Sequence, residues 1–252
     1  MSVASTPLIE VRGLRKSFGG VHAVRDVSFD ISPGEAVALV GDNGAGKSTV
    51  VKMISGALHR DEGEILWEGR PVDIDHPDDA RALGIETMYQ DLALVPDLDV
   101  AGNVFLGCEP MTRRLGILPV LDRPAMRSRS RELLDRVNID MPSLDAAVRQ
   151  LSGGQRQATA IARFLLNESG RLIIMDEPTA ALGVKEQRRV LELISSLKEH
   201  GVAMLIVSHN LDHVFDVCER IVVLRVGRVA GTVLTSESEK GDVVGLIVGE
   251  GP

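Results

Sequence analysis

The sequence predicts an α/β protein with a mixed central sheet, an antiparallel β subdomain and an inserted helical subdomain. Residues 9–12 and 27–31 alternate apolar and polar side chains, which is the period-2 pattern of strands with one wet face. Residues 171–175 and 202–207 are short apolar runs typical of buried strands. The helical periodicity of residues 185–200 between these runs indicates a right-handed parallel crossover.

The chain of 252 residues is long enough for one large domain, or for a domain with an inserted subdomain. From about residue 101 to residue 149, Arg and Leu recur at helical spacing and prolines interrupt the pattern. We therefore expect one domain over residues 1–252, with residues 1–100 and 150–252 forming the core and the antiparallel β subdomain, and 101–149 the helical subdomain. The basic bias of this subdomain fits a solvated helix face and a partner contact equally well.

Net charge, cysteine content and the lengths of apolar stretches argue against several classes of protein. A formal net charge of −8 argues against a general nucleic-acid binder, because that class typically carries a basic surplus. Cys108 and Cys218 lie far apart in no C-x-x-C arrangement, which predicts no disulfide framework and fits a reducing cytoplasm. The N-terminus shows no signal-peptide pattern, and no apolar stretch approaches the ~18 residues of a spanning helix. We expect any role at a membrane to depend on a partner protein.

One segment fits the phosphate-loop pattern G-x-x-x-x-G-K-[ST]. An apolar strand pattern precedes it and a helical pattern follows it, so backbone N–H groups and the positive end of a helix point to one place. We predict that Lys47 reaches the β- and γ-phosphates of a nucleoside triphosphate and that Ser48 ligates Mg²⁺. The alternative is a glycine-rich turn without a ligand. The predicted loop comprises Gly41, Asp42, Asn43, Gly44, Ala45, Gly46, Lys47, Ser48 and Thr49.

Two adjacent acids follow the apolar run of residues 172–175. A carboxylate at the end of a strand beside the phosphate-loop strand can hold the water shell of Mg²⁺, and we assign this role to Asp176. Glu177 is then placed to orient or deprotonate the attacking water. Two adjacent acids alone are commonplace, but combined with a phosphate loop they form a specific signal.

A second anion site is predicted where Ser152, Gly153, Gly154 and Gln155 open a helix. Small residues and a hydroxyl at a helix N-terminus suit anionic oxygens. Only the first of the two predicted phosphate-binding sites, the loop of residues 41–49, contains a lysine and a predicted Mg²⁺ ligand. This asymmetry predicts that a second subunit supplies the second half of a shared site. The alternative is an N-cap without a ligand.

Together these motifs resemble the ATP-binding cassette (ABC) ATPase family across nearly the whole chain, which implies a P-loop NTPase fold of the ABC type. In that family, residues 151–155 match the signature motif, which faces the γ-phosphate of ATP held by the opposite protomer. Gln90 resembles the Q-loop glutamine, which contacts Mg²⁺ or water and senses the membrane partner. His209 resembles the switch histidine at the γ-phosphate, and Phe18 the aromatic ring that stacks on adenine. Without the resemblance, His209 is equally well a solvent-facing residue at a strand end, and the alternative for Phe18 is a place in the core.

The resemblance implies a set of roles at the ATP site. The implied catalytic residues are Glu177, His209, Gln90 and Lys47, and the implied metal ligands are Ser48, Gln90 and Asp176.

One departure from the family pattern narrows the subfamily. Where the family usually has the D-loop aspartate, this chain has Gly183. The change puts the usual cross-dimer contact in doubt, although not nucleotide binding. Residues 41–46, 89–94 and 175–186 resemble ATPases of bacterial monosaccharide importers of the ribose, xylose and fructose type, many of which are tandem. The single cassette resembles the fructose-type members.

The implied function is that of an ATPase subunit powering monosaccharide import. Two copies are expected to close head to tail over two ATP·Mg²⁺. The implied partners are a membrane permease at the cytoplasmic face of the membrane and, indirectly, a periplasmic or lipid-anchored sugar-binding protein, with no nucleic acid. Two alternatives stay open: an ABC ATPase acting on nucleic acid or the ribosome, and a weakly hydrolytic regulatory subunit. Glu177 and His209 argue against the second, and Gly183 leaves it open.

Overall fold

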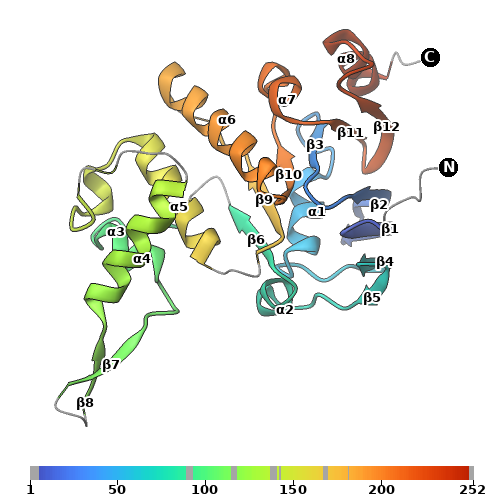
Figure 1. Cartoon of the computed structure of the whole chain (residues 1–252). Coiled ribbons are helices and arrows are strands. Elements are labelled where there is room, and N and C mark those ends of the chain that lie inside the picture. The colour runs from blue at the N-terminus through green and yellow to red at the C-terminus, as the bar shows by residue number, and fades with distance from the viewer. Residues whose placement is uncertain are drawn as a thin grey trace. The chain divides into compact units, whose positions relative to one another are not determined.

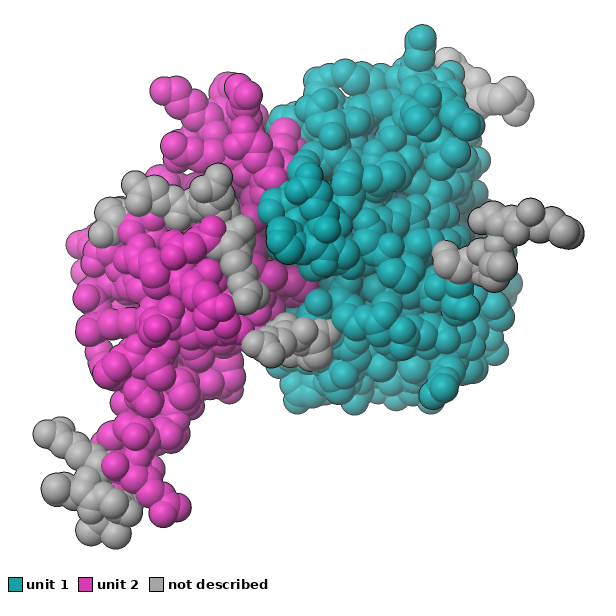
Figure 2. Space-filling model, viewed as in Figure 1, with its two compact units in different colours: residues 1–87, 169–178, 194–252 teal, residues 88–168, 179–193 magenta. Residues whose placement is uncertain are grey.

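A computed structural model describes most of the chain, which separates into two compact units (Figure 2). Unit 1 comprises residues 1–87, 169–178 and 194–252, and unit 2 comprises residues 88–168 and 179–193. The described residues are 6–88, 93–114, 118–136, 141, 143–166, 170–180 and 182–249.

A ten-stranded sheet runs in the order β5-β4-β1-β2-β12-β11-β3-β10-β9-β6 (Figure 1). The strands are β1 (Ile9–Phe18), β2 (Val21–Ile31), β3 (Ala36–Gly41), β4 (Glu62–Trp67), β5 (Arg70–Val72), β6 (Ile85–Met88), β9 (Leu172–Asp176), β10 (Ala203–Val207), β11 (Arg220–Arg225) and β12 (Arg228–Leu234).

The middle of the sheet is parallel and its edge is antiparallel. Strands β9, β10, β3 and β11 pair in parallel, and their side chains are almost all buried, as expected for strands covered on both faces. Strands β1, β2, β4 and β5 pair antiparallel, and β11 and β12 form a further antiparallel pair. The structure therefore confirms both the predicted mixed sheet and the parallel pairing of residues 171–175 with 202–207.

Register places the carboxyl ends of the parallel strands at one edge of the sheet. Val207 of β10 pairs with Asp176 of β9 and with Leu39 of β3, and Gly41 pairs with Leu224 of β11. In open α/β sheets, ligands bind outside this edge. The two motifs that follow β3 and β9 are therefore neighbours in space.

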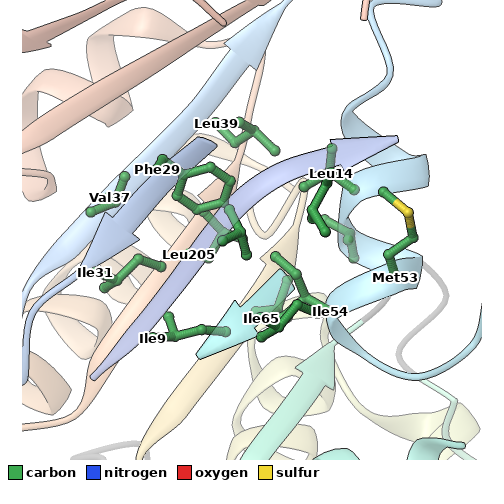
Figure 3. Packing of buried hydrophobic residues seen from close by; sticks show 14 of the residues in the cluster. Ile9, Leu14, Phe29, Ile31, Val37, Leu39, Met53, Ile54, Ile65 and Leu205 are labelled. Atoms are coloured by element: carbon green, nitrogen blue, oxygen red, sulfur yellow. The ribbon is translucent and has the colours of Figure 1, made fainter. Parts of the chain in front are cut away.

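Apolar side chains from strands and one helix pack together in the core of unit 1 (Figure 3). Burial of such side chains supplies most of the free energy of folding. Among the buried side chains of this core are Ile9 and Leu14 of β1, Phe29 and Ile31 of β2, Val37 and Leu39 of β3, Met53 and Ile54 of α1, Ile65 of β4 and Leu205 of β10.

Four helices of unit 1 are α1 (Lys47–Ile54), α2 (Pro77–Ala82), α7 (Leu211–Val217) and α8 (Lys240–Val248). Helix α6 (Val184–Glu199) follows β9 along the chain. Helix α2 begins at a capping box of His76 and Asp79, which satisfies backbone N–H groups that an isolated helix start would leave without partners. Within the described part of the chain, no helix has both the length and the apolar character needed to cross a membrane.

Unit 2 is helical, with one hairpin that the sequence pattern did not predict. Its elements are α3 (Val100–Val104), β7 (Met111–Arg114), β8 (Leu118–Leu121), α4 (Arg123–Arg136), a 3₁₀ turn (Val148–Gln150) and α5 (Gly153–Leu166). Strands β7 and β8 form a two-stranded antiparallel hairpin at one end of α4 (Figure 1). The strands are short, with a proline in β8 and exposed apolar side chains, so they lack the alternation that identifies a half-buried strand.

Candidate functional site

The phosphate loop connects the end of β3 to the start of α1. Gly41 and Gly46 have φ values of 150° and 106°, in the left-handed region that favours glycine. A methyl group at residue 46 would lie 2.6 Å from the carbonyl oxygen of Ala23, and one at residue 41 would overlap the carbonyl oxygen of Leu224. Both glycines are therefore required by backbone conformation and by close approach of neighbouring strands. The loop exposes Asp42, Asn43, Gly44 and Ser48 and buries Ala45.

Lys47 folds back over its own loop. Its Nζ donates hydrogen bonds to the carbonyl oxygens of Gly41 (2.8 Å) and Asp42 (3.0 Å). Burial lowers the pKa of Lys47, and the carboxylates of Glu177, Asp42 and Asp176 oppose that change. The ammonium group is thus held at the mouth of the loop by carbonyl dipoles and nearby carboxylates. A polyphosphate placed there would offer it stronger, charge-assisted hydrogen bonds.

Asp176 ends β9 and Glu177 follows in an unusual backbone conformation. Glu177 has a φ of 53°, which is uncommon for a residue other than glycine, and its amide donates to the carbonyl of Val207 (2.9 Å). A residue in this conformation persists only where the surrounding structure holds it in place, and such residues are frequent at functional sites. Burial first, and the charge of Glu177 second, raise the pKa of Asp176, whereas Lys47 opposes the rise.

His209 pairs with Glu177. The Nδ1 atom of His209 donates a hydrogen bond to Oε1 of Glu177 at 2.7 Å. The histidine side chain is 76% exposed and that of Glu177 is 18% exposed, so most of the imidazole stays accessible to a ligand. Asn210 caps α7 by accepting a hydrogen bond from the amide of His213, which fixes the turn that carries His209. His209 is thus both solvent-facing and joined to the predicted catalytic acid.

The second predicted phosphate-binding site is the start of α5, in unit 2. The hydroxyl of Ser152 accepts from the amide of Gln155 (3.3 Å), and Oε1 of Gln155 accepts from the amide of Ser152 (3.0 Å). This reciprocal pair is a capping box. The amides of Gly153 and Gly154 belong to the first turn, where a helix supplies no carbonyl partner. Ser152 is therefore the N-cap of α5, and whether the amides of Gly153 and Gly154 also bind an anion is part of the proposed function below.

The structure describes Phe18 but not Gln90. Phe18 ends β1 with its side chain 51% exposed, so the alternative of a core phenylalanine is wrong. Lys16 lies on the same strand with its Nζ 5.8 Å from the centre of the Phe18 ring, and sequence reasoning did not single it out. The i, i+2 spacing, which places side chains on one face of a strand, was the available signal. Gln90 lies outside the described residues.

Comparison with known proteins identifies relatives of the whole chain. The family model described as "ABC transporter" matches residues 24–180. The fructose import ATP-binding protein of Rhizobium meliloti is 46% identical over 98% of this chain and 96% of its own length. The xylose/arabinose import ATP-binding protein of Sulfolobus acidocaldarius is 49% identical over 88% of this chain and 86% of its own length. A ribose import ATP-binding protein of Rubrobacter xylanophilus is 46% identical, and this chain spans only 47% of it.

Solved structures agree with the predicted fold. An ATP-binding cassette in a dimeric post-hydrolysis state, bound to ADP and Pi, has 28% identity and a TM-score of 0.74 over 90% of this chain and 98% of its own. Another ATP-binding cassette of an ABC transporter, at 24% identity, has a TM-score of 0.84 over 96% of this chain and 98% of its own, which shows the fold. The predicted P-loop fold of the ABC type is confirmed. This chain belongs to the ABC transporter family, as an ATP-binding and ATP-hydrolysing subunit.

Proposed function

We propose that this chain hydrolyses ATP to power the import of a monosaccharide through a membrane permease. One observation carries the ATPase part: the phosphate loop, Asp176 and the hydrogen-bonded pair of Glu177 and His209 all belong to the carboxyl edge of one sheet. The sugar class rests on the fructose, xylose/arabinose and ribose importers among the relatives. Nothing in the comparisons favours an ATPase that acts on nucleic acid or the ribosome.

The loop of residues 41–49 is proposed to bind the phosphates of ATP, with Lys47 at the β- and γ-phosphates and Phe18 stacked on adenine. The exposed hydroxyl of Ser48 and the carboxylate of Asp176 are hard oxygen donors of the kind that Mg²⁺ prefers. The described residues contain no cluster of three His, Cys, Asp or Glu that would form a protein cage for a metal. Mg²⁺ typically takes one or two protein oxygens and completes its shell with phosphates and water, so the residues fit. When bound, Mg²⁺ would neutralise charge on the phosphates.

Glu177 is proposed to hold the attacking water, as acceptor of its proton. The hydrogen bond from His209 fixes the direction of the carboxylate, and the exposed edge of the imidazole is available to the γ-phosphate. Lys47 stabilises the negative charge that develops on the phosphoryl oxygens. Gln90, outside the described residues, is proposed as a further ligand of Mg²⁺ or of the water.

The functional form is proposed to be a homodimer with two equivalent sites. Each site would combine the phosphate loop of one copy with residues 152–155 of the other, whose first-turn amides face the γ-phosphate. Loss of the γ-phosphate by hydrolysis removes the charge that both copies contact, so the dimer opens. The solved cassettes described as dimeric support this assembly.

The remaining partners follow from the proposed import role. The dimer would lie at the cytoplasmic face of a membrane, bound to the permease, and a sugar-binding protein would deliver the substrate. We propose a single domain in which residues 101–149, together with the Q-loop, pass the motion of the dimer to the permease.

ATP-dependent dimerisation tests the shared-site mechanism. The Glu177→Gln variant retains an acceptor of similar size but cannot take a proton, so we expect a dimer by light scattering with ATP·Mg²⁺ and a monomer without it. Replacing Ser152 with tryptophan in the same variant is expected to abolish the dimer. Glu192→Gln, on the exposed side of α6, is the matched control for loss of one charge. A Glu177→Gln chain that binds ATP tightly yet stays monomeric, alone and with the permease, contradicts the mechanism.

The sugar class is tested separately, with permease and binding protein reconstituted in vesicles. Uptake of fructose, xylose or ribose that requires ATP and is lost with Glu177→Gln supports the proposal. ATP turnover that no monosaccharide stimulates, and that drives no uptake, contradicts it.

A further inference from the structure

The turn that joins β1 to β2 lies beside the phosphate loop and carries an exposed aromatic ring. The carbonyl oxygen of Ala23 would lie 2.6 Å from a methyl group at Gly46, so β2 approaches the loop closely there. Phe18 pairs with Val21, which is two residues, or about 7 Å, along the strand from Ala23. The ring is 51% exposed and therefore offers an accessible face close to a ligand of the loop.

A β-bulge shapes this end of the hairpin. Lys16 pairs with Val24 and Ser17 pairs with His22, so Ala23 is an extra residue on β2. Bulges bend a strand and re-aim neighbouring side chains, and they are frequent beside active sites. The hydroxyl of Ser17 is hydrogen-bonded to Nδ1 of His22 at 2.8 Å, which joins the two strands beyond the bulge. The orientation of the aromatic ring therefore depends on what holds the last residues of β1.

Asp61, in the segment before β4, contacts the end of β1 through its backbone and its side chain. Its amide donates to the carbonyl of Arg15 (2.9 Å). Its Oδ2 accepts from the amide of Ser17 (2.7 Å), and its Oδ1 accepts from Nζ of Lys16 (2.6 Å). The hydrogen bond from Lys16 first, and that from Ser17 second, lower the pKa of Asp61 below its ordinary value of 3.8. At neutral pH the ionised carboxylate thus binds both a backbone amide and an ammonium group.

Lys16 connects this carboxylate to the ring of Phe18. The lysine side chain is only 14% exposed, and its Nζ lies over the ring, within the range at which a cation is attracted to an aromatic face. Because Asp61 holds the same Nζ, the cation leaves the ring only when the ion pair breaks. Methyl groups at Gly19 and Gly20 would meet no atom of the described residues within 4 Å beyond their chain neighbours, so the turn leaves space for a planar group.

We propose that Asp61 is a positioning residue for the base of the bound nucleotide: by holding the last residues of β1, it keeps the ring of Phe18 in place to stack on the base. The inference rests on the proposed function, in which Phe18 stacks on adenine. An Asp61 that only joined β1 to β4 would change the melting temperature. It would leave the preference for a nucleotide over a bare polyphosphate unaltered.

The first test compares a nucleotide with a polyphosphate that has no base. Titration calorimetry measures binding of ADP·Mg²⁺ to the full chain and its displacement by inorganic tripolyphosphate. Asparagine has one oxygen where Asp61 has two, so we expect Asp61→Asn to weaken ADP binding about fivefold and tripolyphosphate binding less than about twofold. Glu62→Gln breaks the neighbouring ion pair with Arg15 and is the matched control, expected to change neither affinity. Equal losses for the two ligands with Asp61→Asn, or no loss, overturn the inference.

The second test asks whether Asp61 acts through the aromatic ring. We expect Phe18→Ala to weaken ADP binding about tenfold, because stacking on the base is lost. Without the ring there is nothing for the carboxylate to position, so adding Asp61→Asn to Phe18→Ala is expected to weaken binding less than about twofold further. Losses that multiply to about 50-fold in the double variant would mean that the two residues act independently, and would overturn the proposal.

A change at Lys16 gives the same comparison while Asp61 stays intact. Lys16→Met keeps the stem of the side chain and loses the ion pair and the cation over the ring. We expect ADP binding to weaken about threefold and tripolyphosphate binding to stay unchanged. A Lys16→Met chain that binds ADP as the unmodified chain does contradicts the inference.

These results separate the inference from the proposed function. Weaker ADP binding with Phe18→Ala, but not with Asp61→Asn, removes the inference alone. Unaltered ADP binding with Phe18→Ala, alongside a loss with Lys47→Ala, removes the stacking role of Phe18 and the inference with it. Absence of ADP binding by the unmodified chain removes the proposed function itself.

Discussion

The two loops proposed to hold phosphate are built on opposite principles. The loop from Gly41 to Lys47 depends on backbone: its three glycines adopt positive φ values, and the lysine donates hydrogen bonds to carbonyl oxygens of its own loop. The loop from Ser152 to Gln155 is an ordinary helix start whose polar side chains satisfy each other in a capping box. In the proposed function, the first loop therefore binds its anion within one chain. The second is proposed to bind an anion only when another copy presents one to its amides.

The largest expected difference between the two loops is in ATP affinity, and it is tested by removing one polar side chain from each loop. We expect Lys47→Ala to weaken ATP binding by the isolated chain on the order of 100-fold, or ~2.7 kcal/mol, because a charge-assisted contact to the phosphates is lost. Ser152→Ala is expected to change the affinity of the isolated chain less than about twofold. Titration calorimetry with ATP·Mg²⁺ at concentrations that keep the chain monomeric measures both. Equal losses would show that the second loop binds nucleotide without a partner.

The next largest expected difference is in the free energy of unfolding when one glycine of each loop is replaced by alanine. Gly46→Ala forces a left-handed φ on alanine and places a methyl group 2.6 Å from a backbone carbonyl oxygen, so we expect a loss of about 2 kcal/mol of unfolding free energy. At Gly153 the added methyl group meets only the movable side chain of Leu182, and we expect a loss of about 1 kcal/mol or less. Urea unfolding compares the two variants. An equal loss of unfolding free energy for Gly153→Ala and Gly46→Ala would contradict the difference expected between the two loops.

Two substitutions of Ser152 distinguish the contribution of the capping box to stability from its proposed role in dimerisation. Ser152→Ala removes the N-cap and is expected to cost about 1 kcal/mol of stability. Ser152→Asp keeps a good N-cap, so we expect little change in the urea midpoint. The new charge faces the proposed γ-phosphate, and ATP-dependent dimerisation should be lost in the Glu177→Gln background. A dimer that persists with Ser152→Asp would place the γ-phosphate elsewhere.

The smallest expected effect concerns the carboxylate at the end of β9. Because burial raises the pKa of Asp176 above its ordinary value of 3.8, the folded chain disfavours the ionised form. Asp176 therefore reduces stability increasingly as pH rises above 3.8, and Asp176→Asn should be the more stable protein at pH 7. We expect a gain below about 1 kcal/mol, since the group is partly solvated and screened. Melting temperatures at several pH values measure it.

The gain in stability of Asp176→Asn should shrink as the pH falls through the raised pKa of the folded chain, and it should vanish below 3.8, where both the folded and the unfolded chain bind the proton. A gain that is independent of pH would attribute the effect to packing rather than to charge.

The sequence by itself determined the features that depend on local chemistry. Glycines at positions 41 and 46 followed by Lys47 specify a loop because their residue types match particular backbone conformations. The apolar run before Asp176 specifies a buried strand ending in an acid for the same local reason. The overall class of mixed sheet followed from periodicity alone.

The tertiary structure decided what depends on strand order and on contacts distant along the chain. His209 meets Glu177 across 32 residues because β10 pairs beside β9, and periodicity carries no information about that neighbour. The exposure of Phe18, the β7–β8 hairpin and the hydrogen bonds between Asp61 and the end of β1 are likewise outcomes of packing. The physical reason is the same in each case: a residue's own conformational preference acts over a few residues, whereas its neighbours in space are set by how the whole chain buries its apolar surface.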